Sequence, residues 1–158
     1  MEAMEYFYER TGVQPYLLIC DSFDGKGREI TDREAHHYLQ RLYDSLYEDE
    51  GHVIFAFMEY EQSEYHTYLY AGRTAVFVLD DKGREMFLEL ADRFYTDRSL
   101  SDEAYFDRVF RTAADQIMKT GERGYVSFIW KERSAEPAGA CSRMSEKGGL
   151  GRSGQGVA

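Results

Sequence analysis

The chain has 158 residues, of which 43% are apolar and 30% are charged, a balance that fits one folded domain and excludes wholesale disorder. Its 29 acidic residues outnumber the 19 basic ones and give a formal net charge of −10. That charge argues against nucleic-acid backbones and anionic membrane surfaces as direct partners, and it favours basic partners.

The cysteines and the N-terminus bear on the cellular compartment. Cys20 ends an apolar run and Cys141 lies among glycine and serine residues, so a framework disulfide is not expected. The N-terminal sequence lacks a basic segment followed by an apolar one, and no apolar run approaches the roughly 18 residues of a membrane span. We therefore expect a cytoplasmic protein that folds without a cofactor, a metal or a disulfide.

The first part of the chain predicts one strand and one loop. Residues 1–14 fit either a short helical turn or an edge segment. The run YLLIC at 16–20 follows a proline and precedes an aspartate, which is typical of a central strand buried on both faces. Residues 21–31 contain two glycines and predict a tight hairpin loop.

The pattern of this loop recurs later in the chain. The sequence DGKGREI at 24–30 resembles DDKGREM at 80–86. A duplicated half-domain would require the flanking sequences to align as well, and they do not. We interpret both segments as similar hairpin turns in which Gly27 and Gly83 adopt a positive φ.

A helix is predicted to start after Thr31. Thr31 and Glu34 have the spacing of a capping box, in which each side chain accepts a hydrogen bond from the backbone N–H of the other residue. Apolar residues then recur at helical spacing over 32–48 and define the core-facing side of this helix. These residues are Ala35, Leu39, Leu42 and Leu46.

From residue 52 the apolar period changes to two, which predicts strands. Three strands are expected, at Val53–Tyr60, Tyr65–Tyr70 and Thr74–Leu79. The links between them have hairpin length, so the three should form an antiparallel meander.

Two further helices are predicted after these strands. The segment 83–96 has an apolar face at helical spacing, although Met86–Leu90 also fits a hairpin strand. The helix at 101–120 has Ser101 as its N-cap and Gly121 as its C-terminal signal.

Together these elements predict an α+β fold, with about five strands in an antiparallel-rich sheet and three helices packed mainly on one face. The element order is compatible with an elaborated ferredoxin-like arrangement. A last strand at Tyr125–Trp130 would close the sheet. Residues 1–133 then form a single acidic domain, and the Gly/Ser-rich segment 134–158 is expected to be a disordered tail.

Few residues suggest catalysis. Cys20 lies at the end of the predicted central strand, where nucleophiles occur in α/β enzymes, but no histidine is placed in the sequence to activate it. His66 shares a predicted strand face with tyrosines and, beside a glutamate across the hairpin, is a candidate general base, but a strand histidine among tyrosines is far more often structural. His36 and His37 point about 100° apart on a helix, so the pair does not favour a shared metal.

The most unusual stretch runs from Leu42 to Gly72 and contains no lysine or arginine. Its acidic residues alternate with tyrosines, whose rings pack on a partner and still hydrogen-bond. Such a field of carboxylates imitates a phosphodiester backbone and competes for arginine and lysine grooves. The alternative is an ordinary solvated face of an acidic protein. The acidic residues of the stretch are Asp44, Glu48, Asp49, Glu50, Glu59, Glu61 and Glu64.

We therefore expect an acidic, non-enzymatic binding protein, namely an inhibitor or nucleic-acid mimic that occupies a basic groove on a nuclease or other nucleic-acid-binding protein. Anti-CRISPR and other anti-defence inhibitors of phage and mobile elements, and immunity proteins against toxins, have this general profile. One alternative is a small enzyme or ligand-binding domain with a pocket around His66 or Cys20, and another is a homo-oligomer formed through the tyrosine-bearing face. The expected contact residues are Glu48, Asp49, Glu50, Glu59, Tyr60, Glu61, Glu64, Tyr65 and Tyr68.

Overall fold

The computed structural model describes residues 1–119, 143–145 and 155–157. The last two of these segments form short strands, β4 (Arg143–Ser145) and β5 (Gln155–Val157). The strand expected at 125–130 lies outside the described residues, as does most of the predicted tail.

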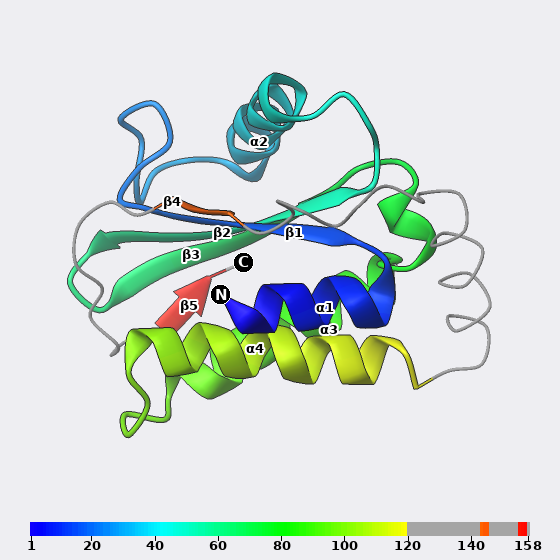
Figure 1. Ribbon diagram of the computed structural model, residues 1–158. Coiled ribbons are helices and arrows are strands. Elements are labelled where there is room, and N and C mark those ends of the chain that lie inside the picture. The colour runs from blue at the N-terminus through cyan, green and yellow to red at the C-terminus, as the bar shows by residue number, and fades with distance from the viewer. Residues whose placement is uncertain (120–142, 146–154, 158) are drawn as a thin grey trace.

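A mixed sheet lies at the centre of the molecule (Figure 1). Its three long strands are β1 (Gln14–Cys20), β2 (His52–Glu61) and β3 (Glu64–Ala71), and the strand order is β4-β1-β2-β3-β5. The crossover through α2 (Asp32–Leu46) returns the chain so that β2 runs parallel to β1, whereas β2 and β3 form an antiparallel hairpin. The α+β class is confirmed, but the sheet is mixed rather than antiparallel-rich.

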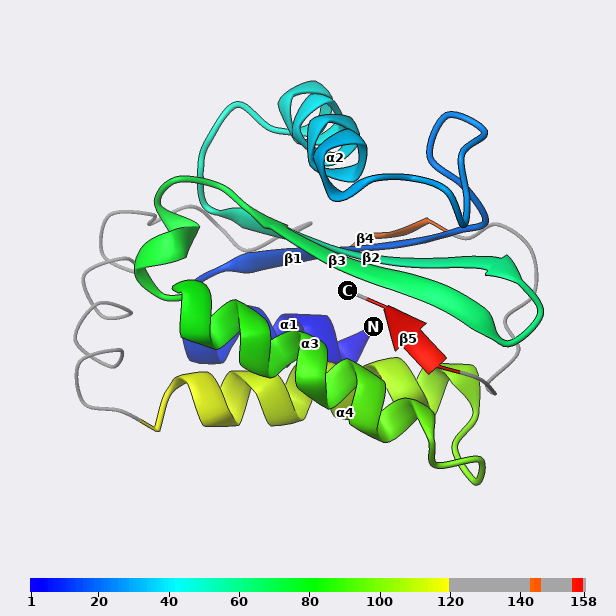
Figure 2. The ribbon, with the colours of Figure 1, turned by 180° about the vertical axis from the view of Figure 1, so that it is seen from behind.

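Helices cover both faces of this sheet (Figures 1 and 2). α1 (Glu2–Thr11), α3 (Asp81–Tyr95) and α4 (Asp102–Ile117) lie on one face, and α2 alone lies on the other. The prediction that the helices pack mainly on one face is therefore wrong for α2. Both faces of β1 and β2 are apolar, so helices must pack on each face to bury its side chains.

The direct pairing of β1 with β2 also rules out the ferredoxin-like arrangement. In a ferredoxin-like sheet the two strands of a split βαβ unit are separated by another strand. Here the seven residues of β1 pair with His52–Met58 without an intervening strand. Residues 1–14, for which a helical turn and an edge segment were both open, contain a ten-residue helix, α1.

The predicted third strand, Thr74–Leu79, is wrong. The segment contains instead a short 3-10 helix, η1 (Ala75–Phe77). The N–H groups of Thr74 and Ala75 donate to the carbonyl of Glu50 at 3.2 and 3.1 Å, so this backbone folds across the end of the sheet rather than along β3. Tertiary hydrogen bonds have overridden the β propensity of the sequence AVFVL.

The two glycine turns also differ from the prediction. In the first, Phe23 and Lys26 form an isolated bridge, and the positive φ angles fall on Asp24 and Gly25 rather than on Gly27. In the second, Gly83 lies inside α3, where its N–H donates to the side chain of the N-cap, Asp80, at 2.8 Å. A similar sequence thus forms a loop in one place and a helix start in the other, and the hairpin alternative for 86–90 is wrong.

The start of α2 confirms the capping box. The Thr31 hydroxyl accepts from the Glu34 N–H at 3.2 Å, and Glu34 Oε1 accepts from the Thr31 N–H at 3.1 Å. Ala35 and Leu39 are buried as expected, but Leu46 is 37% exposed, and Tyr43 takes the buried place near the end of the helix. The apolar face therefore rotates toward Tyr43 along the helix.

Two apolar cores lie on the two faces of the sheet. The larger core, under α1, α3 and α4, contains a cluster of edge-to-face phenylalanines, in which Phe87 and Phe110 contact each other and both contact Phe7 and Phe55. The smaller core, under α2, has a rim of half-buried tyrosines. The rim residues are Tyr38, Tyr47, Tyr60, Tyr68 and Tyr70.

Candidate functional site

The acidic stretch singled out by the sequence divides into two groups at opposite ends of β2. Glu48–Glu50 lie in the loop that leads from α2 into β2, and Glu61 and Glu64 flank the turn that leads out of it. β2 has ten residues, and at about 3.3 Å per residue it separates the two groups by roughly 30 Å. Figure 1 shows the two connections at opposite edges of the molecule.

The backbone of the first group, the acidic loop Glu48–Glu50, is held on both sides. The Tyr43 hydroxyl donates to the Asp49 carbonyl at 2.9 Å and accepts from the His52 N–H at 3.1 Å. The Glu50 carbonyl accepts from two N–H groups of the segment after β3. Three hydrogen bonds thus hold the carbonyls of Asp49 and Glu50, and the fourth ties Tyr43 to the start of β2, so the carboxylates of these two residues project from a defined frame.

The side chains of the acidic loop differ in how far they are neutralised. Glu50 accepts from the Arg73 N–H at 3.0 Å and lies 3.4 Å from the Arg73 guanidinium. Asp49 accepts from the Gly51 N–H at 2.9 Å and lies 2.8 Å from Nδ1 of His52. Glu48 is exposed, and no cation of the described residues lies within ion-pair distance of it.

His52, the first residue of β2, lies next to Asp49 of the acidic loop. Its ring stacks on Tyr47 at 3.6 Å between centroids. Burial lowers the pKa of His52, and the nearby Asp49 carboxylate opposes that shift. A neutral imidazole therefore leaves the negative charge of Asp49 in place, whereas Arg73 partly neutralises Glu50.

An exposed phenylalanine stands beside the acidic loop. Phe77 is 66% exposed, the highest value among the large apolar side chains that the structure describes. It belongs to η1, whose first residues are hydrogen-bonded to the Glu50 carbonyl. Aromatic residues, phenylalanine included, are enriched at the cores of protein–protein interfaces, so an exposed Phe77 two residues after Ala75 is a candidate contact.

The second group, at the β2–β3 turn, is partly neutralised by an arginine from elsewhere in the sequence. The Arg28 guanidinium pairs with Glu61 at 3.0 Å and with Glu64, and it lies 5.6 Å from the centre of the Tyr60 ring. The hydrogen bond that Arg28 donates to Glu64, followed by the charges of both glutamates, raises the pKa of Arg28. The stretch lacks basic residues in sequence, but the fold supplies Arg28 and Arg73.

Two of the expected contact residues point toward the helices instead of outward. Tyr65 is 1% exposed, and its hydroxyl donates to Asp92 at 3.1 Å. Glu59 accepts from the Tyr95 hydroxyl at 3.4 Å. Burial raises the pKa of Asp92, and the hydrogen bond from Tyr65 opposes that shift. Tyr65 and Glu59 thus connect the hairpin to α3.

Tyr68 lies on the α2 side of the sheet and is half-buried. Its ring centroid is 5.6 Å from that of Phe23, and burial raises its pKa to about 12, with a smaller contribution from the Asp32 charge.

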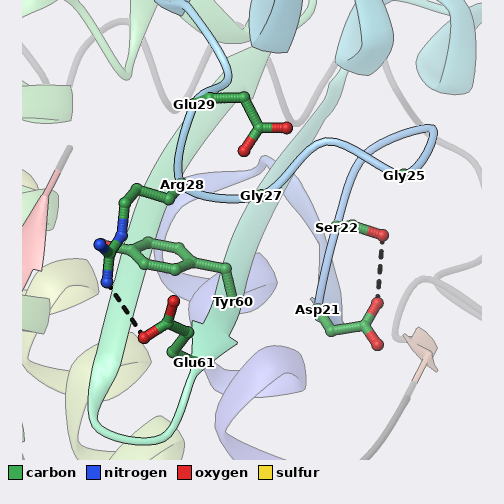
Figure 3. A pocket seen from close by; sticks show the side chains of 8 residues that line it. All are labelled: Asp21, Ser22, Gly25, Gly27, Arg28, Glu29, Tyr60 and Glu61. Carbon is green, nitrogen blue, oxygen red and sulfur yellow. Dashed lines mark hydrogen bonds and ion pairs between the residues drawn. The ribbon is translucent and has the colours of Figure 1, made fainter.

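An open depression lies beside the second group, where the carboxyl ends of β1 and β2 meet (Figure 3). Its volume is about 340 Å³. Ligands of α/β sheets commonly bind outside the carboxyl ends of parallel strands. The lining residues are Asp21, Ser22, Gly25, Gly27, Arg28, Glu29, Tyr60 and Glu61.

Comparison of the chain with known protein families, with curated proteins and with solved structures finds no match. The candidate sites therefore rest on their geometry alone.

The residues considered for catalysis do not line this depression. Cys20 and His66 are both buried, and neither is among its lining residues. His66 Nε2 lies 3.4 Å from the Arg28 carbonyl, and its ring packs against Tyr60 at 4.7 Å. His36 and His37 lie on the exposed side of α2, with His36 5.3 Å from the Tyr70 ring.

Among the described residues, no group of three or more histidine, cysteine, aspartate or glutamate side chains is placed to hold a metal ion. Within the same residues, every helix is too short or too polar to cross a membrane.

Sequence reasoning missed three residues of these sites: Arg28, Arg73 and Phe77. Arg73 directly follows the cation-free stretch, so extending the window by one residue past Gly72 would have included it. Arg28 contacts glutamates 33 and 36 positions away, and no sequence pattern signals such a pair. Phe77 sits in an apolar run that favours burial, so only its place in η1 reveals its exposure.

Proposed function

We propose that this protein is an acidic, non-enzymatic binding protein that occupies a basic groove on a nuclease or other nucleic-acid-binding protein, in the manner of an anti-defence inhibitor or a toxin-immunity protein. The observation that carries the proposal is the acidic loop Glu48–Glu50, in which three hydrogen bonds hold the carbonyls of Asp49 and Glu50. A nucleic-acid mimic needs carboxylates at defined positions. A loop whose backbone is already fixed provides such positions, and it loses little conformational entropy on binding.

The distribution of charge supports the same function. Residues 21–73, which comprise α2, the β2–β3 hairpin and their loops, contain twelve carboxylates and five lysines or arginines, a net charge of −7. Such a field steers a basic partner toward this side of the molecule and speeds association.

The contact surface that follows is narrower than the one expected from the sequence. Glu48, Asp49 and Glu50 meet partner cations, and Phe77 supplies the desolvated contact beside them. Tyr60, Glu61 and Glu64 lie at the other end of the sheet and, with Tyr68 further along β3, form a second, separate contact area. Tyr65 and Glu59 serve the packing of the hairpin on α3.

A pocket-based function around His66 or Cys20 is the weaker candidate, because the depression at the strand ends is lined by neither residue.

The test compares two charge reversals of equal size. The double variant Glu48→Lys/Asp49→Lys changes the acidic loop, and Glu85→Lys/Glu89→Lys makes the same change on the exposed side of α3. Tagged wild-type protein captures its partner from the native host, and the purified partner is then titrated with each variant at several salt concentrations.

We expect Glu48→Lys/Asp49→Lys to weaken binding at least 100-fold, about 3 kcal/mol, and Glu85→Lys/Glu89→Lys to weaken it less than about fivefold. Wild-type protein should also displace nucleic acid from the partner at a one-to-one ratio. Equal effects of the two variants, or a partner that binds no nucleic acid, would contradict the proposal. Thermal unfolding of each variant shows that the domain remains folded.

A further inference from the structure

Arg28 occupies a place built for an arginine side chain. Its guanidinium lies 5.6 Å from the centre of the Tyr60 ring and pairs with the carboxylates of Glu61 and Glu64. A planar guanidinium that stacks on an aromatic ring and bridges carboxylates is the arrangement by which proteins recognise arginine. At this end of the sheet the arginine comes from the protein's own loop.

The guanidinium is held weakly compared with the loop that carries it. The side chains of Arg28, Glu61 and Glu64 are 59%, 60% and 46% exposed, and water competes strongly with ion pairs of that kind. The loop backbone has contacts of its own: the Ile30 N–H donates to the Gly27 carbonyl at 3.1 Å, Phe23 and Lys26 form a bridge, and the Arg28 carbonyl lies 3.4 Å from His66 Nε2. The side chain can therefore leave Tyr60 while the loop stays in place.

The neighbouring residue, Gly27, keeps the loop close to the same ring. A Cβ at position 27 would lie 2.8 Å from Cβ of Tyr60, so only glycine allows this approach. Figure 3 shows Glu29 and Tyr60 on either side of the Gly27 backbone, with the Arg28 guanidinium against the ring. The depression thus opens directly beside the place where Arg28 is bound.

The charges around the depression leave room for a second cation. Among the described residues, Asp21 accepts a hydrogen bond from Ser22 at 3.2 Å and no basic side chain lies within ion-pair distance of Asp21 or Glu29. With Glu61, the lining has three carboxylates against the single guanidinium of Arg28. A metal ion is a poor fit, because no three ligands converge in the described part of the chain.

We propose that this depression receives an arginine side chain of a partner protein, and that Arg28 is an internal competitor for Tyr60, Glu61 and Glu64. The incoming guanidinium takes the place over Tyr60, and Arg28 swings toward solvent. The site lies at the far end of the sheet from the acidic loop, so it gives the basic partner a second point of attachment. The identity of the partner rests on the proposed function, but the preference for arginine does not.

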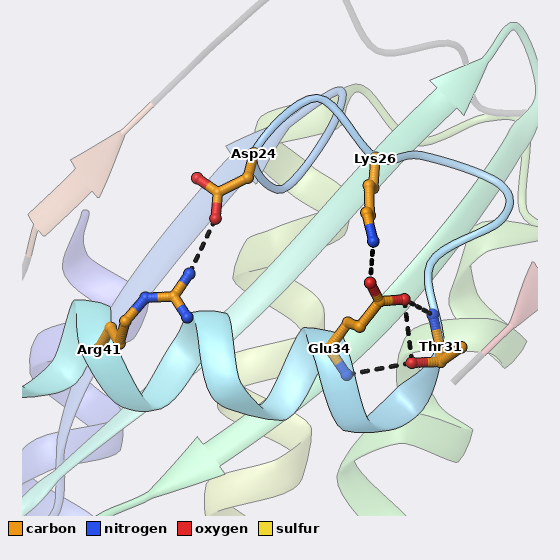
Figure 4. A network of polar contacts seen from close by, with 5 residues as sticks. All are labelled: Asp24, Lys26, Thr31, Glu34 and Arg41. Atoms are coloured by element: carbon orange, nitrogen blue, oxygen red, sulfur yellow. Dashed lines mark hydrogen bonds and ion pairs between the residues drawn. The ribbon is translucent and has the colours of Figure 1, made fainter.

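If Arg28 competes with an incoming arginine, removing the Arg28 side chain should strengthen the binding of an arginine peptide. The probe is a nona-arginine peptide, titrated by calorimetry against the full chain at low salt, with a nona-lysine peptide as the second probe. The variant is Arg28→Gln, and the matched control is Arg41→Gln. Arg41 pairs with Asp24 at 2.8 Å on the α2 side of the same loop, so its loss changes the net charge equally (Figure 4).

We expect Arg28→Gln to bind the arginine peptide on the order of fivefold more tightly than wild type, and Arg41→Gln to change the affinity less than about twofold. The gain should be smaller for the lysine peptide, because an ammonium does not stack or bridge as a guanidinium does. Adding Tyr60→Ala to Arg28→Gln should remove the gain.

Equal gains for Arg28→Gln and Arg41→Gln would overturn the proposal, because net charge alone would then explain them. No gain for Arg28→Gln, in protein shown to be folded by circular dichroism, would overturn it too. If Arg28→Gln does not fold, Glu61→Gln/Glu64→Gln replaces it, and an affinity for the arginine peptide equal to that of wild type would overturn the proposal. The titration uses no captured partner, so its failure is distinct from a failure at Glu48 and Asp49.

Discussion

Glu34 joins the start of α2 to the loop before it. Its carboxylate pairs with Lys26, and it accepts from both the N–H and the hydroxyl of Thr31 at 3.1 Å (Figure 4). The hydrogen bond from Lys26, followed by those from Thr31, lowers the pKa of Glu34 to about 2. A single side chain thus caps a helix and anchors a loop.

This shift predicts a dependence of stability on pH. Because the pKa of Glu34 is lower in the folded protein than in the unfolded chain, its contribution is complete above the ordinary value near 4.5. It is lost as the pH falls from there toward about 2. The difference in urea midpoint between wild type and Glu34→Gln should therefore be clear at pH 6 and nearly absent at pH 2.

Glu85→Gln is the control for this experiment. Glu85 is exposed on α3 and has no ion pair within the described residues. The urea midpoint of Glu85→Gln should differ little from that of wild type at both pH values. A Glu34→Gln difference that stays constant between pH 6 and pH 2 would contradict the role given to the carboxylate.

At the scale of the element, η1 turns Phe77 outward while β2 turns its phenylalanines inward. Phe77 is 66% exposed, whereas Phe57 is 1% exposed and stacks on Tyr65 at 4.8 Å. The two residues belong to similar apolar sequences, VFV and AFM. The hydrogen bonds from Thr74 and Ala75 to Glu50 set the direction of η1, and so they set the exposure of Phe77.

This contrast predicts very different costs for the same substitution. Phe57→Ala removes a buried ring and should lower the free energy of unfolding by about 3–5 kcal/mol. Phe77→Ala should change it by less than about 0.5 kcal/mol, because the ring is mainly in water. Urea unfolding of both variants measures the difference. A cost above about 1.5 kcal/mol for Phe77→Ala would assign Phe77 to the core rather than to a contact surface.

At the scale of the whole molecule, repulsion among the excess negative charges destabilises the folded state. Residues 1–119 contain 25 acidic and 13 basic residues, a net charge of −12. Most of their ion pairs are exposed, so each contributes little. Mutual repulsion of the excess carboxylates therefore has the larger effect on stability.

Added salt should consequently stabilise the protein. Raising sodium chloride from 20 to 300 mM shortens the Debye length from roughly 20 Å to about 6 Å, so it screens the repulsion. The free energy of unfolding should rise on the order of 1 kcal/mol. The variant Glu85→Lys/Glu89→Lys, with four fewer net negative charges, should respond less. Destabilisation of the wild type by salt would show that its ion pairs outweigh the repulsion.

Local spacing in the sequence determined several elements of this protein. The capping box of Thr31 and Glu34 and the N-cap at Ser101 mark the starts of α2 and α4, because their hydrogen bonds reach only three residues along the chain. The strands β1 and β2 follow from apolar runs that suit burial on both faces. These predictions depend on neighbours within a few residues.

Tertiary structure decided where the carboxylates of the acidic stretch lie and which of them are paired with arginines. The sequence fixes its lack of lysine and arginine, but Arg28 reaches Glu64 across 36 residues, and Arg73 pairs back to Glu50 across 23. The fold also separates Glu48–Glu50 from Glu61 by the length of β2. Net charge belongs to composition, whereas the position and neutralisation of each carboxylate depend on packing between distant segments.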